Sequence, residues 1–332
     1  MKIAFAGLKH GHIFVLYEMA KNHPEYEIVG AFEGEKTYRK QAESKGVRCN
    51  YQSYDALLSD TQVEVIALGG AYGERGEMAK RALLAGKHVI ADKPLCTKKA
   101  ELDEIRAAAK KSGKCVSVML TMRYEPKMIA AKKLFESGAL GEINNVSFGG
   151  QHPLQYGRRP DWYFEKEMHG GLFNDIAIHG IDALSYAFDL TVEKVNAARL
   201  WNCFAKEETG FCDSGQLMLT AESGAGILAD VSYAIPDGVE FALPYYWQFY
   251  IWGTKGVLSF ALNEKESTYY LVGDKEPHIL EEEPAPNYLD DFLRMVRGES
   301  GVILPMQEAL SSTEKTLAIQ ELAERFDGGV SV

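Results

Sequence analysis

Three side chains that could carry acid–base chemistry lie in two short segments. The segment AGKHVIADKPLCTKKAELDEI contains Asp92, Lys93 and Pro94 directly after an apolar run. The segment MHGGLFNDIAIHGIDAL places Asp175 four residues before His179. A helix brings residues four apart to one face, so the carboxylate could orient the imidazole, or both could reach one substrate hydroxyl. A core histidine beside an acid would show the same spacing.

Lys93 follows a predicted strand, and its position depends on the sheet around it. Apolar β-rich runs alternate with helical patterns up to about residue 122, which predicts a parallel sheet with crossover helices. Ligands of such sheets collect at the carboxyl ends of the strands, and Pro94 restricts the backbone before it. A solvated surface lysine is the alternative. The expected strands are Ile3–Ala6, Ile28–Phe32, Val63–Leu68, His88–Ala91 and Val116–Leu120, and the expected helices are His12–Asn22, Lys36–Lys45, Arg75–Ala85 and Lys98–Lys111.

The opening stretch MKIAFAGLKHGHIF is a strand, a glycine turn and the start of a helix. Dinucleotide folds use Gly-x-Gly-x-x-Gly here, so that the backbone can approach a pyrophosphate. Gly7 keeps the first position, whereas Lys9 and His12 replace the other two glycines and Gly11 lies one residue early. Any strand-turn-helix with one glycine would look similar. The expected cofactor contacts are Gly7, Lys9, His10, Gly11, His12, Glu33, Gly69, Lys93 and Pro94.

Glu33 ends the second predicted strand, 22 residues after Gly11. A carboxylate there would accept hydrogen bonds from the adenosine ribose and repel a 2′-phosphate, which predicts NAD rather than NADP. Lys36 and Arg39 are close enough in sequence to soften that preference, and a solvated loop acid is the alternative. We expect no metal at His10 and His12, because the sequence shows no third ligand beside them.

Composition favours a small-molecule partner. The chain has 332 residues, 46% of them hydrophobic, enough for two domains. Its formal charge of −11 is spread along the chain, which argues against nucleic acid or anionic lipid as a partner. Five cysteines without metal-ligand spacing predict buried thiols in a reducing compartment, so we expect a cytoplasmic protein. No apolar run approaches the ~20 residues of a membrane span.

The pattern changes after Pro126 and predicts an α+β domain with a mostly antiparallel sheet. We expect a helix to Ser137, a strand over Ile143–Phe148, a helix over Leu172–Phe188, several β runs and a final helix over Met306–Phe326. The predicted domains are therefore residues 1–122, a Rossmann domain, and residues 123–332, with a final helix that could pack on either. The aromatic run LPYYWQFYIWG alternates as a strand would and predicts a sheet face or subunit interface.

Several motifs, in one order, resemble those of the Gfo/Idh/MocA oxidoreductases, a family named for glucose-fructose oxidoreductase and inositol dehydrogenase. They are Gly86-Lys87-His88-Val89 leading to Asp92-Lys93-Pro94, Gly170-Gly171 through Asp175 to His179, Arg123-Tyr124-Glu125-Pro126, SGALGEI, WGTKGVLSF and EALSSTEKTLAIQELA. The resemblance covers essentially the whole chain. Departures from the family pattern are the altered glycine turn, Asp92 in place of glutamate, His169 in place of a glycine, and the loop GGAYGERG.

The resemblance implies a Rossmann domain that binds NAD and an α+β domain whose open sheet forms an oligomer interface, with substrate held between the two. Lys93, Asp175 and His179 fall on the family's catalytic positions. We assign the base to His179, stabilisation of alkoxide character to Lys93, and orientation of the substrate to Asp175. Lysine as the base is the alternative. The expected substrate contacts are Lys93, Arg123, Arg158, Trp162, Asp175 and His179.

The expected activity is hydride transfer between NAD and a hydroxyl carbon of a sugar, inositol or related polyol, by a homodimer or homotetramer. Two other functions are consistent with the same residues. One is a hydrolase or epimerase-like enzyme that keeps NAD bound and oxidises its substrate only transiently. The other is a non-catalytic sensor of a nucleotide or sugar, which the altered glycine turn favours and the Lys-Asp-His set opposes.

Overall fold

The computed structural model describes residues 1–239, 241 and 243–325, which form two compact units. The first unit contains Met1–Leu120, Glu167–Gly170 and Asn287–Glu314. The second contains Thr121–Lys166, Gly171–Pro286 and residues 315–325. The predicted boundary after residue 122 lies close to the first change of unit. A single boundary does not describe the chain, however, because two later segments group with the first unit.

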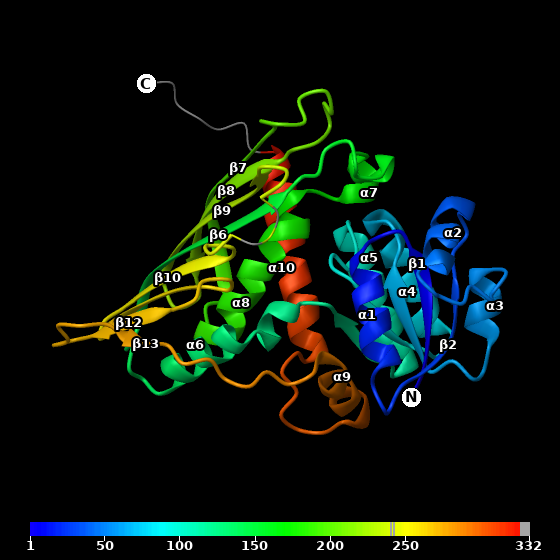
Figure 1. The fold of residues 1–332 in the computed structure, drawn as a ribbon, viewed down its shortest axis with the longest axis horizontal. Coiled ribbons are helices and arrows are strands. Elements are labelled where there is room, and N and C mark those ends of the chain that lie inside the picture. Colours follow the sequence, from blue (N-terminus) through cyan, green and yellow to red (C-terminus); the bar gives the residue numbers. More distant parts are fainter. Residues whose placement is uncertain (240, 242, 326–332) are drawn as a thin grey trace. The chain divides into compact units, whose positions relative to one another are not determined.

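The first unit is built on a five-stranded sheet of order β2-β1-β3-β4-β5. Figure 1 shows most of this unit in blue and cyan, with helices beside the sheet. Every neighbouring pair is parallel, as predicted. Its strands are almost wholly apolar because helices cover both faces of such a sheet. The elements are β1 (Lys2–Leu8), α1 (His12–Lys21), β2 (Glu27–Phe32), α2 (Lys36–Ser44), α3 (Tyr54–Ser59), β3 (Val65–Gly69), α4 (Tyr72–Leu84), β4 (His88–Ala91), α5 (Lys99–Ser112), β5 (Val116–Val118), the short α7 (Lys166–His169) and α9 (Tyr288–Arg297).

Two differences from the predicted elements have local causes. α4 begins three residues earlier than predicted, because the Glu74 carboxylate accepts a hydrogen bond from the Ala71 N–H at 3.1 Å and satisfies the first turn. α3 was absent from the prediction. Its N-cap is Ser53, whose hydroxyl accepts from the Ala56 N–H at 3.0 Å.

The second unit is built on an eight-stranded sheet of order β13-β12-β11-β10-β6-β9-β8-β7. The sheet is mostly antiparallel, as predicted, with one parallel pair between β6 and β9. The elements are η1 (Thr121–Tyr124), α6 (Pro126–Glu136), β6 (Ile143–Pro153), η2 (Asp161–Tyr163), η3 (Phe173–Ala177), α8 (Ile178–Phe188), β7 (Val192–Trp201), β8 (Ser214–Ala221), β9 (Gly226–Ile235), β10 (Gln248–Gly253), β11 (Gly256–Ala261), β12 (Thr268–Leu271) and β13 (His278–Ile279).

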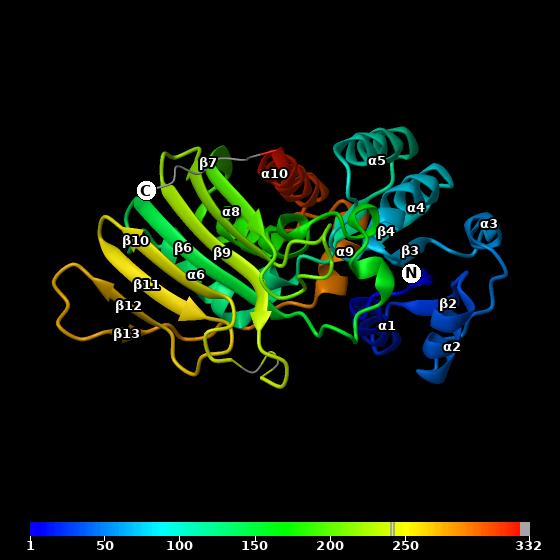
Figure 2. The ribbon, with the colours of Figure 1, turned by 90° about the horizontal axis from the view of Figure 1, so that it is seen from above.

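Helices α6 and α8 cover one face of this sheet (Figure 2). Register places Phe148, Phe249 and Phe260 side by side on the covered face, where all three are buried. A Cβ atom at Gly180 of α8 would lie 2.3 Å from the Phe148 ring. The glycine therefore allows α8 to pack directly against the aromatic row.

The opposite face of the sheet carries exposed apolar side chains. Met218 of β8 pairs in register with Leu228 of β9. Tyr250 and Trp252, two residues apart on β10, lie on the same face as this pair. A hollow of about 450 Å³ lies here, lined in part by Met218, Leu228 and Trp252. The aromatic run of β10 is therefore split between the two faces of the sheet.

The helix predicted over Leu172–Phe188 is present, but its first part, η3, is π-helical rather than α-helical. π-Helical turns occur frequently at functional sites. The final helix, α10 (Met306–Arg325), is divided between the two units after Glu314. Phe326, the predicted last residue of this helix, lies outside the described residues.

Candidate active site

The turn between β1 and α1 is fastened to the end of β3. Gly7 adopts φ +69°, and a Cβ atom there would lie 2.6 Å from the Gly70 nitrogen, so this position requires glycine. The Lys9 and His10 N–H groups donate to the Gly69 carbonyl at 3.2 and 2.9 Å. Gly7 and Gly69, both predicted cofactor contacts, therefore shape the turn that begins α1.

The start of α1 fits an anionic group such as the pyrophosphate of NAD. Gly11 is the N-cap residue, and no described side chain caps this ten-residue helix. A Cβ atom at Gly11 would meet nothing within 4 Å, so the space beside the helix end is open. An uncapped helix N-terminus presents N–H groups and a positive dipole end to an anion.

Glu33 is buried and bonded to the backbone, whereas the sequence suggested a carboxylate that contacts the ribose. Its side chain is only 3% exposed, and its carboxylate accepts hydrogen bonds from the Leu8 N–H at 2.6 Å and the Glu35 N–H at 2.9 Å. These bonds join the end of β2 to the turn after β1. They favour a role in holding the turn over the predicted contact with ribose.

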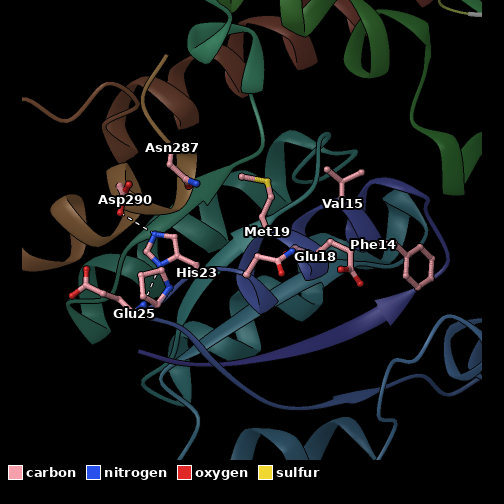
Figure 3. Close-up of a pocket in the computed structure, with 10 residues that line it drawn as sticks. Phe14, Val15, Glu18, Met19, His23, Glu25, Asn287 and Asp290 are labelled. Atoms are coloured by element: carbon pink, nitrogen blue, oxygen red, sulfur yellow. Dashed lines mark hydrogen bonds and ion pairs between the residues drawn. The ribbon is translucent and has the colours of Figure 1, made fainter. Parts of the chain in front are cut away.

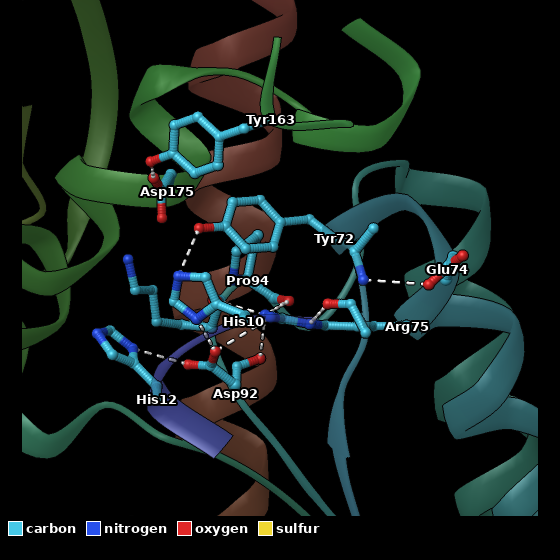
Figure 4. A network of polar contacts seen from close by, with 12 residues as sticks. His10, His12, Tyr72, Glu74, Arg75, Asp92, Pro94, Tyr163 and Asp175 are labelled. Atoms are coloured by element: carbon cyan, nitrogen blue, oxygen red, sulfur yellow. Dashed lines mark hydrogen bonds and ion pairs between the residues drawn. The ribbon is translucent and has the colours of Figure 1, made fainter. Parts of the chain in front are cut away.

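Asp92 is the centre of a buried polar network in the first unit (Figure 4). His10 Nδ1 lies 2.5 Å from Asp92 Oδ2, and His12 Nδ1 lies 3.1 Å from Oδ1. Arg75 Nη2 donates to Oδ2 at 3.0 Å. Burial would raise the pKa of Asp92, but the charge of Arg75 and the hydrogen bond from His10 outweigh it and hold this pKa well below its usual value.

His10 is neutral in this network. Burial lowers the pKa of His10 to about 4, against the opposing effect of Asp92. With the ring proton on Nδ1 directed to Asp92, Nε2 is left to accept from the Tyr72 hydroxyl at 3.2 Å. The buried Tyr72 ring also lies under the Arg75 guanidinium, 4.6 Å from its centroid. Tyr72 and Arg75 were not among the predicted site residues.

The expectation that no third potential metal ligand lies beside His10 and His12 is wrong, because the fold places Asp92 next to them. Donor atoms of His10, His12 and Asp92 all lie within 4.8 Å of one another. The His–Asp separations are hydrogen-bond lengths, and the Arg75 cation shares the same carboxylate. Hydrogen bonding and charge pairing therefore account for this arrangement. Asp92 is 80 residues or more from the histidines, so only the fold brings them together.

Lys93 lies at the carboxyl end of β4, where the sequence placed it. Arg75 fixes the surrounding backbone, because its Nη1 donates to the carbonyls of Asp92, Lys93 and Pro94 at 3.0, 2.6 and 3.1 Å, and its Nε donates to Gly70 at 2.9 Å. The Lys93–Pro94 peptide is cis. Lys93 is 3% exposed. An arginine within a helical pattern looks like a surface residue, so the sequence carried no signal for this role.

Asp175 belongs to the second unit and lies in the π-helical turn. Its Oδ2 atom accepts hydrogen bonds from the hydroxyl of Tyr163 at 2.9 Å and from the hydroxyl of Tyr233 (Figure 4 shows Asp175 with Tyr163). All three residues are buried, and burial raises the pKa of Tyr163 well above its usual value. Tyr163 therefore remains a protonated donor, and the two hydroxyl groups fix the direction of the Asp175 carboxylate. Tyr233 was not anticipated from the sequence.

The other predicted residues of the second unit have different surroundings. His179 of α8 is half-buried, with its ring 5.7 Å from that of Trp247 at a steep angle. Arg123 and Asp182 form a buried fork, with Nε–Oδ2 and Nη2–Oδ1 distances of 2.8 and 2.7 Å. This pair favours a structural role for Arg123 over the predicted substrate contact. Arg158 is exposed, and Trp162 packs against Tyr163.

A separate hollow of about 860 Å³ in the first unit contains none of the predicted site residues (Figure 3). His23 Nε2 lies 2.9 Å from Asp290 Oδ1 at its edge. The lining residues are Phe14, Val15, Glu18, Met19, Asn22, His23, Pro24, Glu25, Asn287 and Asp290.

Two broader expectations can be compared with the structure. None of the described helices is both long enough and apolar enough to cross a membrane. All five cysteines are free thiols. Cys49 and Cys96 are buried as predicted, whereas Cys203 is exposed and Cys115 and Cys212 are half-buried.

Known proteins resemble this chain over both units. It is 27% identical over 262 residues to the uncharacterized oxidoreductase YrbE of Bacillus subtilis (76% of this chain, 73% of that protein). It is 25% identical over 248 residues to myo-inositol 2-dehydrogenase of Thermotoga maritima (73% and 69%). The structure of levoglucosan dehydrogenase in complex with NADH has the same fold, with a TM-score of 0.79, 19% identity and coverage of 98% of this chain and 97% of that one.

Family matches cover most of the sequence. Residues 1–120 match the oxidoreductase family with an NAD-binding Rossmann fold, and residues 128–259 match the GFO/IDH/MocA C-terminal domain. The two matches occur in the order that the motifs predicted. The chain therefore belongs to the Gfo/Idh/MocA family of NAD-binding oxidoreductases.

Proposed function

We propose that this protein is an NAD-dependent dehydrogenase that transfers a hydride between the nicotinamide and a hydroxyl carbon of a sugar, inositol or related polyol. The observation that carries the proposal is Lys93 at the carboxyl end of β4, with its backbone fixed by the buried Arg75. Ligands of doubly wound sheets bind at this edge. A pure binding protein would not need a lysine held so rigidly there.

NAD, when bound, supplies the acceptor or donor of the hydride. Gly7, Gly11 and the first turn of α1 would hold its pyrophosphate. The Lys93 ammonium would stabilise negative charge on the substrate oxygen, and His179 would take the hydroxyl proton. Asp175, held by Tyr163 and Tyr233, would accept a hydrogen bond from a neighbouring hydroxyl. The alternative assignment makes Lys93 the base.

The direct test is NADH formation by the purified protein with candidate polyols. The names of two similar proteins suggest myo-inositol and levoglucosan as the first compounds, followed by a panel of hexoses and pentoses. We expect a substrate-dependent rise in NADH absorbance that Lys93→Ala and His179→Ala abolish while NADH binding persists. Unchanged turnover in both variants would refute the assignment.

The two other functions give different results in the same experiment. An enzyme that oxidises its substrate only transiently would copurify with NAD and convert substrate without net NADH. A sensor would bind nucleotide or sugar without converting either. Mass spectrometry of the reaction mixture, together with the absorbance of the purified protein, distinguishes these cases.

We also propose that the exposed face of the eight-stranded sheet joins copies of this chain into a dimer or tetramer. Its exposed apolar residues are Met218 of β8, Leu228 of β9, and Tyr250 and Trp252 of β10, with Ser147 of β6 in register between Leu228 and Tyr250. An exposed apolar patch across four neighbouring strands is expected of a subunit interface. A cytoplasmic location is a separate proposal, supported by five cysteines without a disulfide.

A further inference from the structure

The Lys9 side chain lies between two glutamates that follow different strands of the first unit. Its Nζ atom forms ion pairs with Glu35 and with Glu74, the latter at 2.7 Å. The Lys9 side chain is 9% exposed, whereas that of Glu35 is 57% exposed. Burial would lower the pKa of Lys9, but its bonds to Glu35 and Glu74 raise it, so the lysine stays charged.

Lys9, Glu35 and Glu74 each follow a different strand, close to the point in the sheet where the strand order reverses. Lys9 follows β1, Glu35 follows β2 and Glu74 lies in the first turn of α4, after β3. The strand order β2-β1-β3 places β2 and β3 on opposite sides of β1. In doubly wound folds a nucleotide binds at this reversal, outside the carboxyl ends of the strands. The ion-paired lysine therefore lies at the expected nucleotide crevice.

The arrangement has a consequence for a nucleotide that carries an additional phosphate. Lys9 already has two anionic partners, and each glutamate would repel a dianion brought close to it. Arg39 is also engaged, since it donates to Glu43 and to the Cys49 carbonyl. Lys36 is the exposed cation that remains at the start of α2. Both carboxylate oxygens of Glu33 accept backbone N–H groups, from Leu8 and Glu35, so this side chain is directed to the turn and not to a ligand.

We propose that Lys9, together with Glu35 and Glu74, determines the preference of this protein for NAD over NADP. The two glutamates exclude the 2′-phosphate by charge and keep Lys9 from pairing with it. This inference rests on the proposed function, because it requires that the chain bind a nicotinamide dinucleotide. It assigns the selectivity to residues other than Glu33.

The test measures the Kd of NADH and NADPH by fluorescence titration of the wild type and of Glu35→Gln/Glu74→Gln. Glutamine at 74 retains an oxygen that can accept from the Ala71 N–H, so α4 keeps its cap. We expect the double variant to bind NADPH at least about fivefold more tightly, with NADH affinity nearly unchanged, because Lys9 is released to pair with the phosphate. Adding Lys9→Ala to the double variant should remove the gain.

A matched control exists on the same unit. Lys80 also bridges two glutamates, Glu77 and Glu104, but on α4 and α5. Glu77→Gln/Glu104→Gln should leave the ratio of the two Kd values unchanged. An unchanged ratio in Glu35→Gln/Glu74→Gln would overturn the inference while leaving the dehydrogenase proposal in place. A wild type that prefers NADPH would overturn both the inference and the proposed dependence on NAD, but not the proposed hydride transfer. Failure of the wild type to bind either nucleotide would instead overturn the inference and the dehydrogenase proposal.

Discussion

Arg75 Nη1 lies 2.6 Å from the carbonyl oxygen of Lys93, and Nη2 of the same guanidinium lies 3.0 Å from the Asp92 carboxylate. One buried side chain therefore both neutralises Asp92 and holds the backbone that carries Lys93. A charge of either sign left alone in this interior would be costly, because burial removes its hydration. Both the stability of the first unit and the position of the Lys93 backbone therefore depend on the contacts of Arg75.

Arg75→Met should destabilise the first unit by about 3–5 kcal/mol, because it leaves Asp92 buried without its cation. Arg75→Met combined with Asp92→Asn should recover part of that loss. Urea unfolding of the single and double variants measures both effects. Arg81→Met, on the same helix, removes an exposed ion pair with Asp55 and should cost no more than about 1 kcal/mol. Equal losses in Arg75→Met and Arg81→Met would contradict this account.

Lys93→Ala should lower kcat/KM for the polyol by about 100-fold or more, with the Kd of NADH little changed. Lys93→Arg keeps the charge and distinguishes the two assignments. It should retain part of the activity if the residue stabilises charge, and should be as inactive as Lys93→Ala if the residue is the base. Lys98→Ala, at an exposed position before α5, is the control and should behave as the wild type.

Tyr233→Phe should weaken substrate recognition, since it removes one of the two hydroxyl groups that orient Asp175. We expect KM to rise by about fivefold, with unchanged NADH affinity, as for loss of roughly 1 kcal/mol of hydrogen bonding. Tyr163→Phe should act in the same direction. Tyr156→Phe removes an exposed hydroxyl bonded to Glu208 and should have no effect. A KM for Tyr233→Phe equal to that of the wild type would argue against Asp175 as the orienting group.

The free energy of unfolding should fall as the pH is lowered from 6.5 to 4. Burial lowers the pKa of His10 to about 4, so within this window the unfolded chain binds a proton that the folded chain does not. The effect of His10 is roughly 3 kcal/mol at most. His88, whose pKa burial also lowers to about 4, should act in the same direction. His10→Gln should flatten the pH profile of urea unfolding, and an equally steep profile would contradict the contribution of His10.

Trp252→Glu should shift the protein toward smaller species in analytical ultracentrifugation, because it places a charge in the apolar patch of the exposed sheet face. Leu84→Glu introduces the same charge at an equally exposed apolar position on α4 and serves as the control. If the wild type sediments as a monomer, or if both variants dissociate equally, the proposed interface is wrong.

Much of the fold could be predicted because its signals are local. The strand His88–Ala91 was predicted at its observed bounds, and four crossover helices were found within a few residues of their ends. Apolar periodicity and glycine at the turns report such elements directly. α3 was missed because a six-residue helix capped by Ser53 has too short a pattern to stand out. The π-helical start before α8 also has no sequence signature.

The sequence by itself determined the parallel sheet, the position of Lys93 at the end of β4, the glycine at residue 7 and the family. The tertiary structure decided which charges meet. Arg75 reaches Asp92 across 17 positions, Lys9 reaches Glu74 across 65, and Asp175 meets Tyr233 across 58. A local pattern depends on neighbours along the chain, whereas the partner of a buried charge depends on which strands and helices lie beside it. For that reason Glu33, Arg123 and Lys9 were recognised as charged residues from the sequence, but their partners came only from the fold.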